Sequence, residues 1–153
     1  MNITFLSIGK TTDQLVAAGC LIYQTRIKKY ISFEWKQTTD IKSLPPNDMK
    51  IREGELIKKH IEKGDHIILL DETGKQFTSK EFAGYISQKQ MENKKQLVFV
   101  LGGAYGFSDE IYKLANEKIS LSKMTFPHQM VRLIFSEQLY RAFTIIKNEP
   151  YHH

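Results

Sequence analysis

Short apolar runs, bounded by polar residues and glycines, recur along the chain and have the length of β-strands. The clearest is the run from His66 to Leu70, which is typical of a strand buried on both faces of a parallel sheet. Strands are predicted at residues 3–8, 31–37, 66–70, 96–101 and 119–121.

Between these runs, apolar residues return at the spacing of amphipathic helices. Helices are predicted at residues 15–30, 47–63, 78–93, 108–118 and 128–147. The alternation favours an α/β fold, with a mostly parallel sheet of five to six strands and helices on both faces. At 153 residues the chain has the size of one domain, which we take to span residues 1–153.

The last predicted helix is apolar on two sides. Its core side holds Val131, Ile134, Phe135, Leu139, Ala142, Ile145 and Ile146. The second arc, roughly opposite, holds Met130, Leu133, Tyr140 and Phe143. Such a helix should be covered on both sides. In so small a domain we expect the second cover to be another subunit, the alternative being a monomer with an exposed apolar strip.

Composition adds a moderate positive charge. Lysine and arginine number 22 against 17 acidic residues, and the net charge of +5 favours a polyanionic partner, although such surfaces also serve solubility alone. No apolar stretch approaches the ~18 residues of a membrane span and no signal-peptide pattern is present, so we expect a cytoplasmic protein without a membrane partner. Cys20 is the only cysteine, which excludes a cysteine-only metal cluster, and we expect no metal.

Two glycine-containing turns were considered as ligand sites. Gly9-Lys10-Thr11 follows the first strand, but a phosphate-binding loop needs another glycine five residues earlier, where Thr4 stands. That turn also lacks the pattern of dinucleotide binders, so a cofactor site must lie elsewhere. Residues 102–106 follow a buried strand, and their missing Cβ atoms allow a ligand to approach the backbone. A tight turn needing positive φ explains the same glycines.

Segments near the C-terminus complete a recognisable pattern. Residues 121–132 join the last strand to the last helix and are rich in hydroxyls; Glu-Gln-Leu-Tyr-Arg-Ala follows at 137–142, and Tyr151-His152 comes near the end. With the strand ending at Asp71 and the Gly102-Gly103 turn, they closely resemble the RlmH family over essentially the whole chain. That family comprises bacterial SPOUT-class methyltransferases that modify N3 of a pseudouridine in the helix 69 loop of 23S ribosomal RNA.

The resemblance implies a C-terminal trefoil knot, a homodimer and S-adenosylmethionine held in the knot. The implied cofactor contacts are Leu70, Gly102, Leu121, Ser122, Lys123, Met124, Thr125 and Phe126. Most of them would be backbone hydrogen bonds to adenine and ribose, with apolar side chains packing on the ring. The implied partner is 23S rRNA within the 70S ribosome. Basic residues that would extend the phosphate footprint are Lys10, Lys28, Lys29, Lys58 and Lys59.

Methyl transfer to N3 requires in-line positioning and loss of the N3 proton. The resemblance makes His152 a candidate proton acceptor and Tyr151 a candidate for stacking on the flipped base. Arg132 and Arg141 are candidates for the cation that stabilises the resulting anion. Each arginine has an alternative role, as a phosphate contact or as a partner of Glu137.

Two other functions remain open at this point. One is a ribosome-binding factor that kept the fold and lost catalysis, against which residues 121–126 argue. The other is a SPOUT methyltransferase that acts on tRNA, against which only the resemblance at Tyr151-His152 speaks. A dinucleotide oxidoreductase has no supporting fingerprint.

Overall fold

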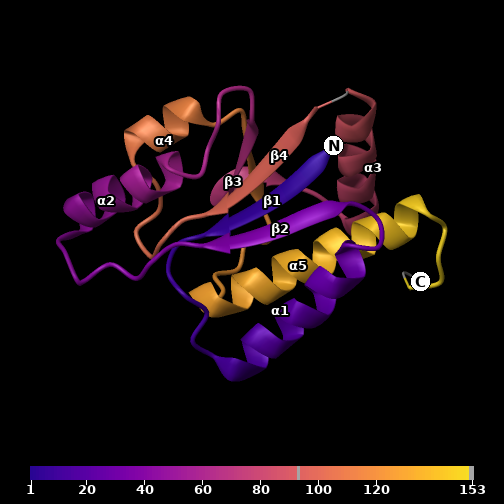
Figure 1. Ribbon diagram of the computed structural model, residues 1–153, viewed down its shortest axis with the longest axis horizontal. Helices are drawn as coiled ribbons and strands as arrows, with labels where there is room; N and C mark the ends of the chain where they lie inside the picture. The colour runs from indigo at the N-terminus through magenta and orange to yellow at the C-terminus, as the bar shows by residue number, and fades with distance from the viewer. Residues whose placement is uncertain (93, 152–153) are drawn as a thin grey trace.

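The computed structural model describes residues 1–92 and 94–151, and within them the strands form one five-stranded sheet (Figure 1). The strands are β1 (Asn2–Ser7), β2 (Ser32–Gln37), β3 (His66–Gln76), β4 (Gln96–Leu101) and β5 (Glu117–Ser120), in the order β2-β1-β4-β3-β5. Every pairing is parallel. The predicted sheet is therefore confirmed, and β3 lies inside it between β4 and β5.

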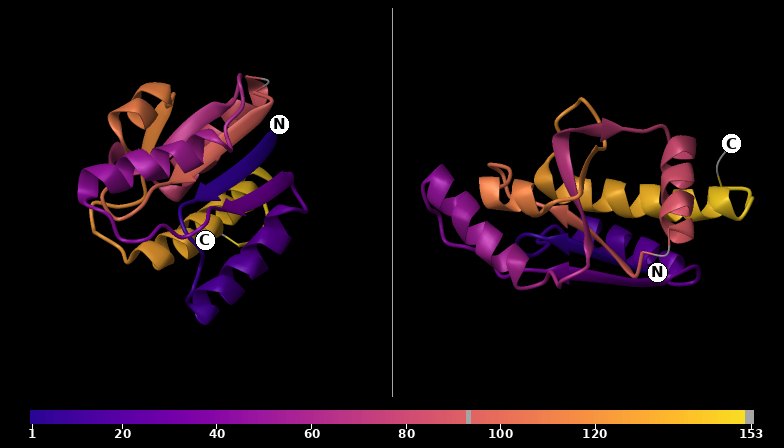
Figure 2. Two further views of the ribbon diagram at one scale, coloured as in Figure 1. Left: turned by 60° about the vertical axis from the view of Figure 1, so that its left-hand side comes forward. Right: turned by 90° about the horizontal axis from the view of Figure 1, so that it is seen from above.

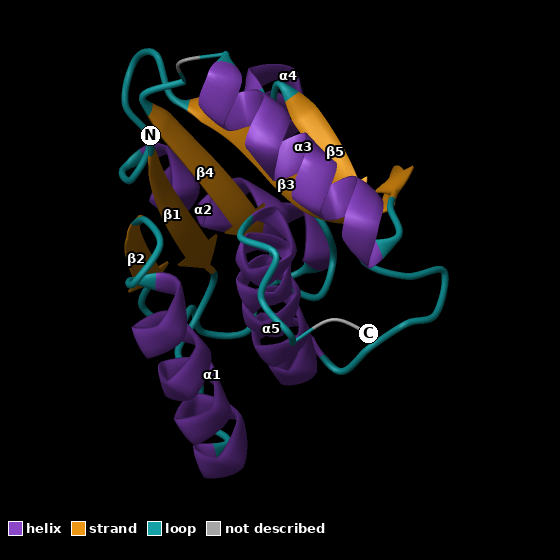
Figure 3. Ribbon diagram, turned by 90° about the vertical axis from the view of Figure 1, so that its right-hand side faces the viewer, coloured by secondary structure: helices purple, strands orange, loops and turns teal. Residues whose placement is uncertain are grey.

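Helices cover both faces of the sheet, as predicted. They are α1 (Gln14–Ile27), α2 (Pro46–Lys58), α3 (Ser79–Met91), α4 (Asp109–Leu114) and α5 (His128–Ile146). Side chains of α1, α3 and α5 join one core cluster, in which the Phe135 ring lies 4.6 Å from that of Phe5 and 4.9 Å from that of Phe99. Side chains of α2 and α4 join the other cluster. Figure 2 shows α1 and α5 side by side, and Figure 3 shows α3 over the β3–β5 end of the sheet.

Local hydrogen bonds explain where the helices begin and end. α3 begins at a capping box, in which Thr78 Oγ1 accepts from Glu81 N and a Glu81 carboxylate oxygen accepts from Thr78 N. α4 ends at Leu114, short of the predicted 118, because Asn116 bonds both backbone groups of Ile67, at 2.7 and 2.9 Å, and so starts β5. α2 ends at Lys58, short of the predicted 63, before the turn that leads into β3.

Apart from the exposed Met130, the second apolar arc of α5 is covered by α1 and by Tyr30, which follows α1, so the expected cover by another subunit was wrong. Phe143 is buried and stacks on Tyr30 with ring centroids 5.7 Å apart. The Tyr140 ring lies 5.8 Å from that of Tyr23. Leu133 packs so closely on Gly19 that an added Cβ would lie 2.8 Å from its Cδ1. α1 itself carries an exposed apolar strip at Leu15, Leu21 and Ile22.

β3 crosses β5 at very short range. Residues 71–74 bulge out between Leu70 and Lys75, both of which pair with Ile119. A Cβ added to Gly74 would lie 2.5 Å from the Ile119 nitrogen, so only glycine fits there. The knot that the family resemblance implies stays a prediction. Within the described residues, no helix is long and apolar enough to cross a membrane.

Candidate functional site

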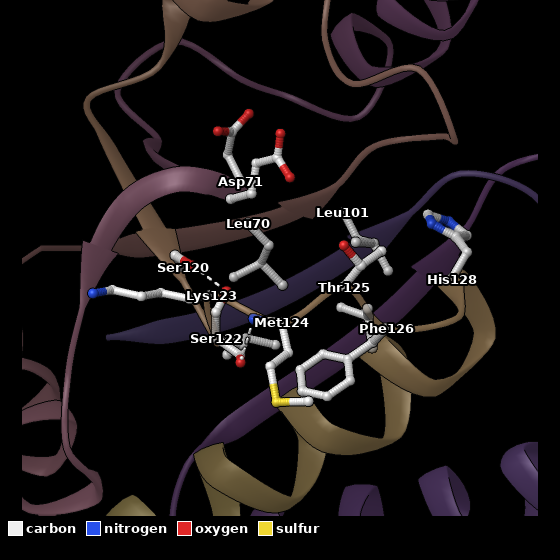
Figure 4. Close-up of a pocket in the computed structure, with 13 residues that line it drawn as sticks. Leu70, Asp71, Leu101, Ser120, Ser122, Lys123, Met124, Thr125, Phe126 and His128 are labelled. Carbon is white, nitrogen blue, oxygen red and sulfur yellow. Dashed lines mark hydrogen bonds between the residues drawn. The ribbon is translucent and has the colours of Figure 1, made fainter.

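A cavity of about 220 Å³ opens at the carboxyl edge of β3, β4 and β5 (Figure 4). Ligands of open α/β sheets bind at this edge, because the loops that follow neighbouring parallel strands converge there. The lining residues come from strand ends, from the loop at 121–126 and from the first turn of α5: Leu70, Asp71, Glu72, Leu101, Ser120, Leu121, Ser122, Lys123, Met124, Thr125, Phe126, His128 and Val131.

The loop at 121–126 is shaped by its own hydroxyl groups. Ser120 Oγ donates to the Ser122 carbonyl at 2.9 Å, and the Met124 amide donates to Ser122 Oγ at 2.9 Å. Pro127, with φ of −53°, then directs the chain into α5. Figure 4 shows the Met124 and Phe126 side chains close together below Leu70, while the Lys123 ammonium extends away from them. Met124 is 75% exposed, so it forms an apolar lip of the cavity rather than part of the core.

Two carboxylates stand at the rim, and the environment of Asp71 keeps it ionised. Its Oδ2 accepts from the Tyr112 hydroxyl at 2.6 Å, and its Oδ1 accepts from the amide and hydroxyl of Thr73 at 2.8 and 2.5 Å. Partial burial alone would raise the pKa of Asp71, but these hydrogen bonds outweigh it and hold the pKa below its ordinary value. The rim is therefore negatively charged at neutral pH.

His128 forms the wall where α5 begins. Burial lowers the pKa of its imidazole, and the charge of Arg132 lowers it further, so the ring is neutral at pH 7. Its Nε2 is buried without a hydrogen-bond partner among the described residues. A neutral ring at this point leaves the cavity without a cation of its own on the α5 side.

Arg132 does not line this cavity. The side chain is 1% exposed, and its Nη2 donates to the Ile8 carbonyl and its Nη1 to Thr11 Oγ1, both at 2.7 Å. Burial lowers the pKa of the guanidinium, which stays charged because arginine side chains do not deprotonate in proteins. Arg132 thus ties α5 to the segment that follows β1, one turn away from His128.

Two of the remaining predicted catalytic residues, Arg141 and Tyr151, lie toward the far end of α5. Arg141 follows His128 by 13 residues, about 20 Å along the helix, and its Nε donates to Glu137 Oε1 at 3.0 Å. Tyr151 OH donates to the same oxygen at 3.1 Å, and the Arg141 guanidinium lies 4.9 Å from the centre of the Tyr151 ring. His152 lies outside the described residues. One chain therefore does not bring Arg141 or Tyr151 to its own cavity.

The sequence located most of the cavity but not all of it. Of the predicted cofactor contacts, Leu70 and residues 121–126 line the cavity, whereas Gly102 does not and its neighbour Leu101 does. Lining residues outside the predicted contacts are Asp71, Glu72, Leu101, Ser120, His128 and Val131. The carboxyl ends of the predicted parallel strands would have pointed to the first four, since such ends meet at one edge of the sheet.

Together, the fold and the cavity define an α/β protein with a cavity at the carboxyl edge of a parallel sheet. A family model described as predicted SPOUT methyltransferase matches residues 1–152. The chain is 53% identical to ribosomal RNA large subunit methyltransferase H of Christiangramia forsetii, over 100% of this chain and 99% of that protein. It is 52% identical to the protein of the same name from Parabacteroides distasonis, with the same coverage. The chain belongs to the SPOUT methyltransferase family and, within it, to the RlmH family.

A solved structure supports the fold. The probable methylase family protein from Haemophilus influenzae Rd KW20 matches with a TM-score of 0.53 at 16% sequence identity. The match covers 96% of this chain and 66% of that one, so this chain spans about two thirds of its length. The likeness extends across the sheet and the helices that frame the cavity, and it bears on architecture alone.

Proposed function

We propose that this protein transfers a methyl group from S-adenosylmethionine to N3 of a pseudouridine in the helix 69 loop of 23S rRNA, on assembled 70S ribosomes. One observation carries the proposal: the cavity at the carboxyl edge is built from Leu70 and residues 121–126, in a chain 53% identical to a ribosomal RNA large subunit methyltransferase H. A ribosomal substrate places the protein in the cytoplasm.

The residues of the cavity fit S-adenosylmethionine. Leu70, Leu101 and Phe126 supply apolar surface for an adenine ring, and the backbone and hydroxyls of residues 120–125 supply hydrogen-bonding groups for adenine and ribose. The ionised Asp71 at the rim and the neutral His128 suit a cation rather than an anion. When bound, the cofactor supplies a methyl group on a positively charged sulfur.

The chain's own residues have two tasks in this reaction. The loop at 121–126 and the first turn of α5 fix one reactant, so that much of the acceleration comes from alignment and exclusion of water. The acceptor N3–H must also lose its proton, a role we assign to His152, with Arg141 stabilising the anion and Tyr151 stacking on the base. Arg132, buried and bonded to Ile8 and Thr11, acts by fixing the start of α5 instead of touching the anion.

The separation along α5 supports a site that two chains complete together. Because Arg141 lies about 20 Å along the helix from His128, the tail of one chain would act on the cavity of a second. We propose a homodimer that buries the α1 strip of Leu15, Leu21 and Ile22, which one chain leaves exposed. Mixing a chain that carries a defective cavity with a chain that carries His152→Ala tests this. Activity recovered only in the mixture supports the shared site, and no recovery despite mixed dimers contradicts it.

We propose that the protein recognises the ribosome through its positive charge and through the shape of the RNA. The exposed lysines Lys10, Lys28, Lys29, Lys58 and Lys59 and the net charge of +5 suit phosphate contacts. Binding should therefore weaken steeply as salt rises, and a salt-independent binding constant would contradict the assignment.

The proposed function is tested by transfer of labelled methyl from S-adenosylmethionine to 70S ribosomes that lack the modification. Free 50S subunits and tRNA are run alongside. Label on the helix 69 pseudouridine of 70S particles is the expected result. Label on tRNA alone would keep the cofactor and overturn the substrate, and cofactor binding without any label would favour a ribosome-binding factor.

A further inference from the structure

A carboxylate from α2 is buried behind the cavity wall. Glu53 is 6% exposed and sits on the face of α2 that packs toward α4 and the turn at 102–106. The next residue, Gly54, is equally crowded, since an added Cβ would lie 3.0 Å from Ser108 Oγ and 3.2 Å from Ile111 Cγ1. α2 is thus pressed closely against the segment that follows β4.

The Glu53 carboxylate bonds the glycine turn itself. The Gly103 amide donates to Glu53 Oε2 at 3.2 Å, and a Cβ on Gly103 would collide with the same carboxylate, 2.5 Å from its Cδ. The turn is closed by the Gly106 amide, which donates to the Gly103 carbonyl at 3.3 Å. Below it, Gly102 lies against the Phe107 ring. The turn is therefore held between one aromatic ring and one carboxylate.

Burying a carboxylate to hold the turn at 102–106 has a large free-energy cost. Burial raises the pKa of Glu53, and the single hydrogen bond from Gly103 offsets this only in part. An apolar side chain would fill the space at lower cost if packing were the only requirement. What Glu53 adds is direction: it orients the Gly103 amide, two residues after the cavity-lining Leu101.

We propose that Glu53 is a positioning residue that fixes the Gly102-Gly103 turn, and through it the Leu101 wall, and so sets the affinity of the cavity for S-adenosylmethionine. The inference rests on the proposed function for the identity of the ligand. It assigns no chemical step to Glu53, which reaches the cavity only through the turn.

The test compares substitutions at Glu53 with the same substitutions at a matched position. Glu55 lies on the same helix, is exposed and pairs with Arg52 at 2.5 Å. Affinities for S-adenosylmethionine and S-adenosylhomocysteine are measured by calorimetry well below the melting temperature of each variant. Glu53→Ala should weaken both by up to about tenfold, the upper bound set by the loss of one hydrogen bond to a carboxylate that holds the turn. Glu53→Gln, whose amide oxygen still accepts from Gly103, should stay within about threefold, and Glu55→Ala should change nothing.

A second substitution reaches the same contact from the other side. Gly103 does not have a positive φ, so Gly103→Ala strains no dihedral angle and acts by displacing the Glu53 carboxylate. It should weaken binding as much as Glu53→Ala does, and the double variant should be no weaker than either one. This comparison, with Glu53→Gln, decides the matter even if Glu53→Ala does not fold.

The outcomes separate the two proposals. Weaker binding by Glu53→Ala and Gly103→Ala, rescued by Gln at position 53, supports the positioning role. Wild-type affinity in the folded variants, with only a lowered melting temperature, would overturn it and leave the proposed function intact. No binding of either ligand by the unsubstituted protein would overturn both.

Discussion

Gly74→Ala is expected to destabilise the protein severely, because the substitution adds one carbon where two strands cross. The added Cβ would lie 2.5, 2.6 and 2.7 Å from the N, C and Cα of Ile119. Carbon contacts prefer roughly 3.5–4.0 Å, so the two backbones must separate by about 1 Å. No side chain can rotate away, since all three atoms belong to the backbone.

The magnitude follows from what the separation disrupts. Forcing an extra methyl into a packed site costs roughly 1–3 kcal/mol. Loosening the pairing of Lys75 with Ile119 and of Gln76 with Ser120 adds about 1 kcal/mol for each hydrogen bond lost. We therefore expect a loss of about 3 kcal/mol in the free energy of unfolding, or roughly 6–12 °C in melting temperature for a chain of this size.

The assay is urea unfolding followed by circular dichroism, with Gly84→Ala as the matched control. Gly84 lies inside α3, and an added Cβ there would meet nothing within 4 Å. The control should be stabilised by up to about 1 kcal/mol through its higher helix propensity. If Gly74→Ala stays within about 0.5 kcal/mol of the unsubstituted protein, the contact between Gly74 and Ile119 is not rigid, which would refute the prediction.

Three further substitutions test the site and its surroundings. Arg132→Met should lower the free energy of unfolding, measured by thermal denaturation, by about 2 kcal/mol, because the Ile8 carbonyl and Thr11 Oγ1 lose their hydrogen-bond donor. Unchanged stability together with lost methyl transfer would instead assign Arg132 a role in catalysis. Ile22→Asp should convert dimers to monomers in sedimentation, whereas Met91→Asp, also exposed but on α3, should not; a dimer in both would place the interface elsewhere. Because the folded pKa of Asp71 is lowered, its stabilisation is present above pH 4 and lost as pH falls through that folded pKa. Asp71→Asn should therefore lower the urea midpoint at pH 7, and this deficit should shrink as the pH falls below the unfolded pKa of about 4. A deficit that stays equal as the pH falls would refute the assignment.

The sequence predicted what depends on local pattern. The run from His66 to Leu70 and its neighbours indicated the parallel sheet, because buried parallel strands are apolar on both faces. The loop at 121–126 was located through its resemblance to a family, and the sheet order then explains why it meets Leu70.

What the sequence missed depends on contacts between distant segments. In the sequence, a charged residue inside an apolar helix suggests a catalytic role, as it did for Arg132. The structure shows that Arg132 is buried because it bonds Ile8 and Thr11, which lie far from it in the sequence. The two-sided pattern of α5 correctly indicated two covers, but periodicity does not specify that α1 is one of them. Gly74 carried no signal at all, since its requirement comes from Ile119 in another strand.

α5 keeps the two halves of the candidate site at a fixed separation. Its first turn borders the cavity through His128 and Val131, while Arg141 and the docked Tyr151 lie toward the other end. Cofactor affinity and acceptance of the methyl group should consequently be separable properties, the first belonging to one chain and the second to a pair of chains.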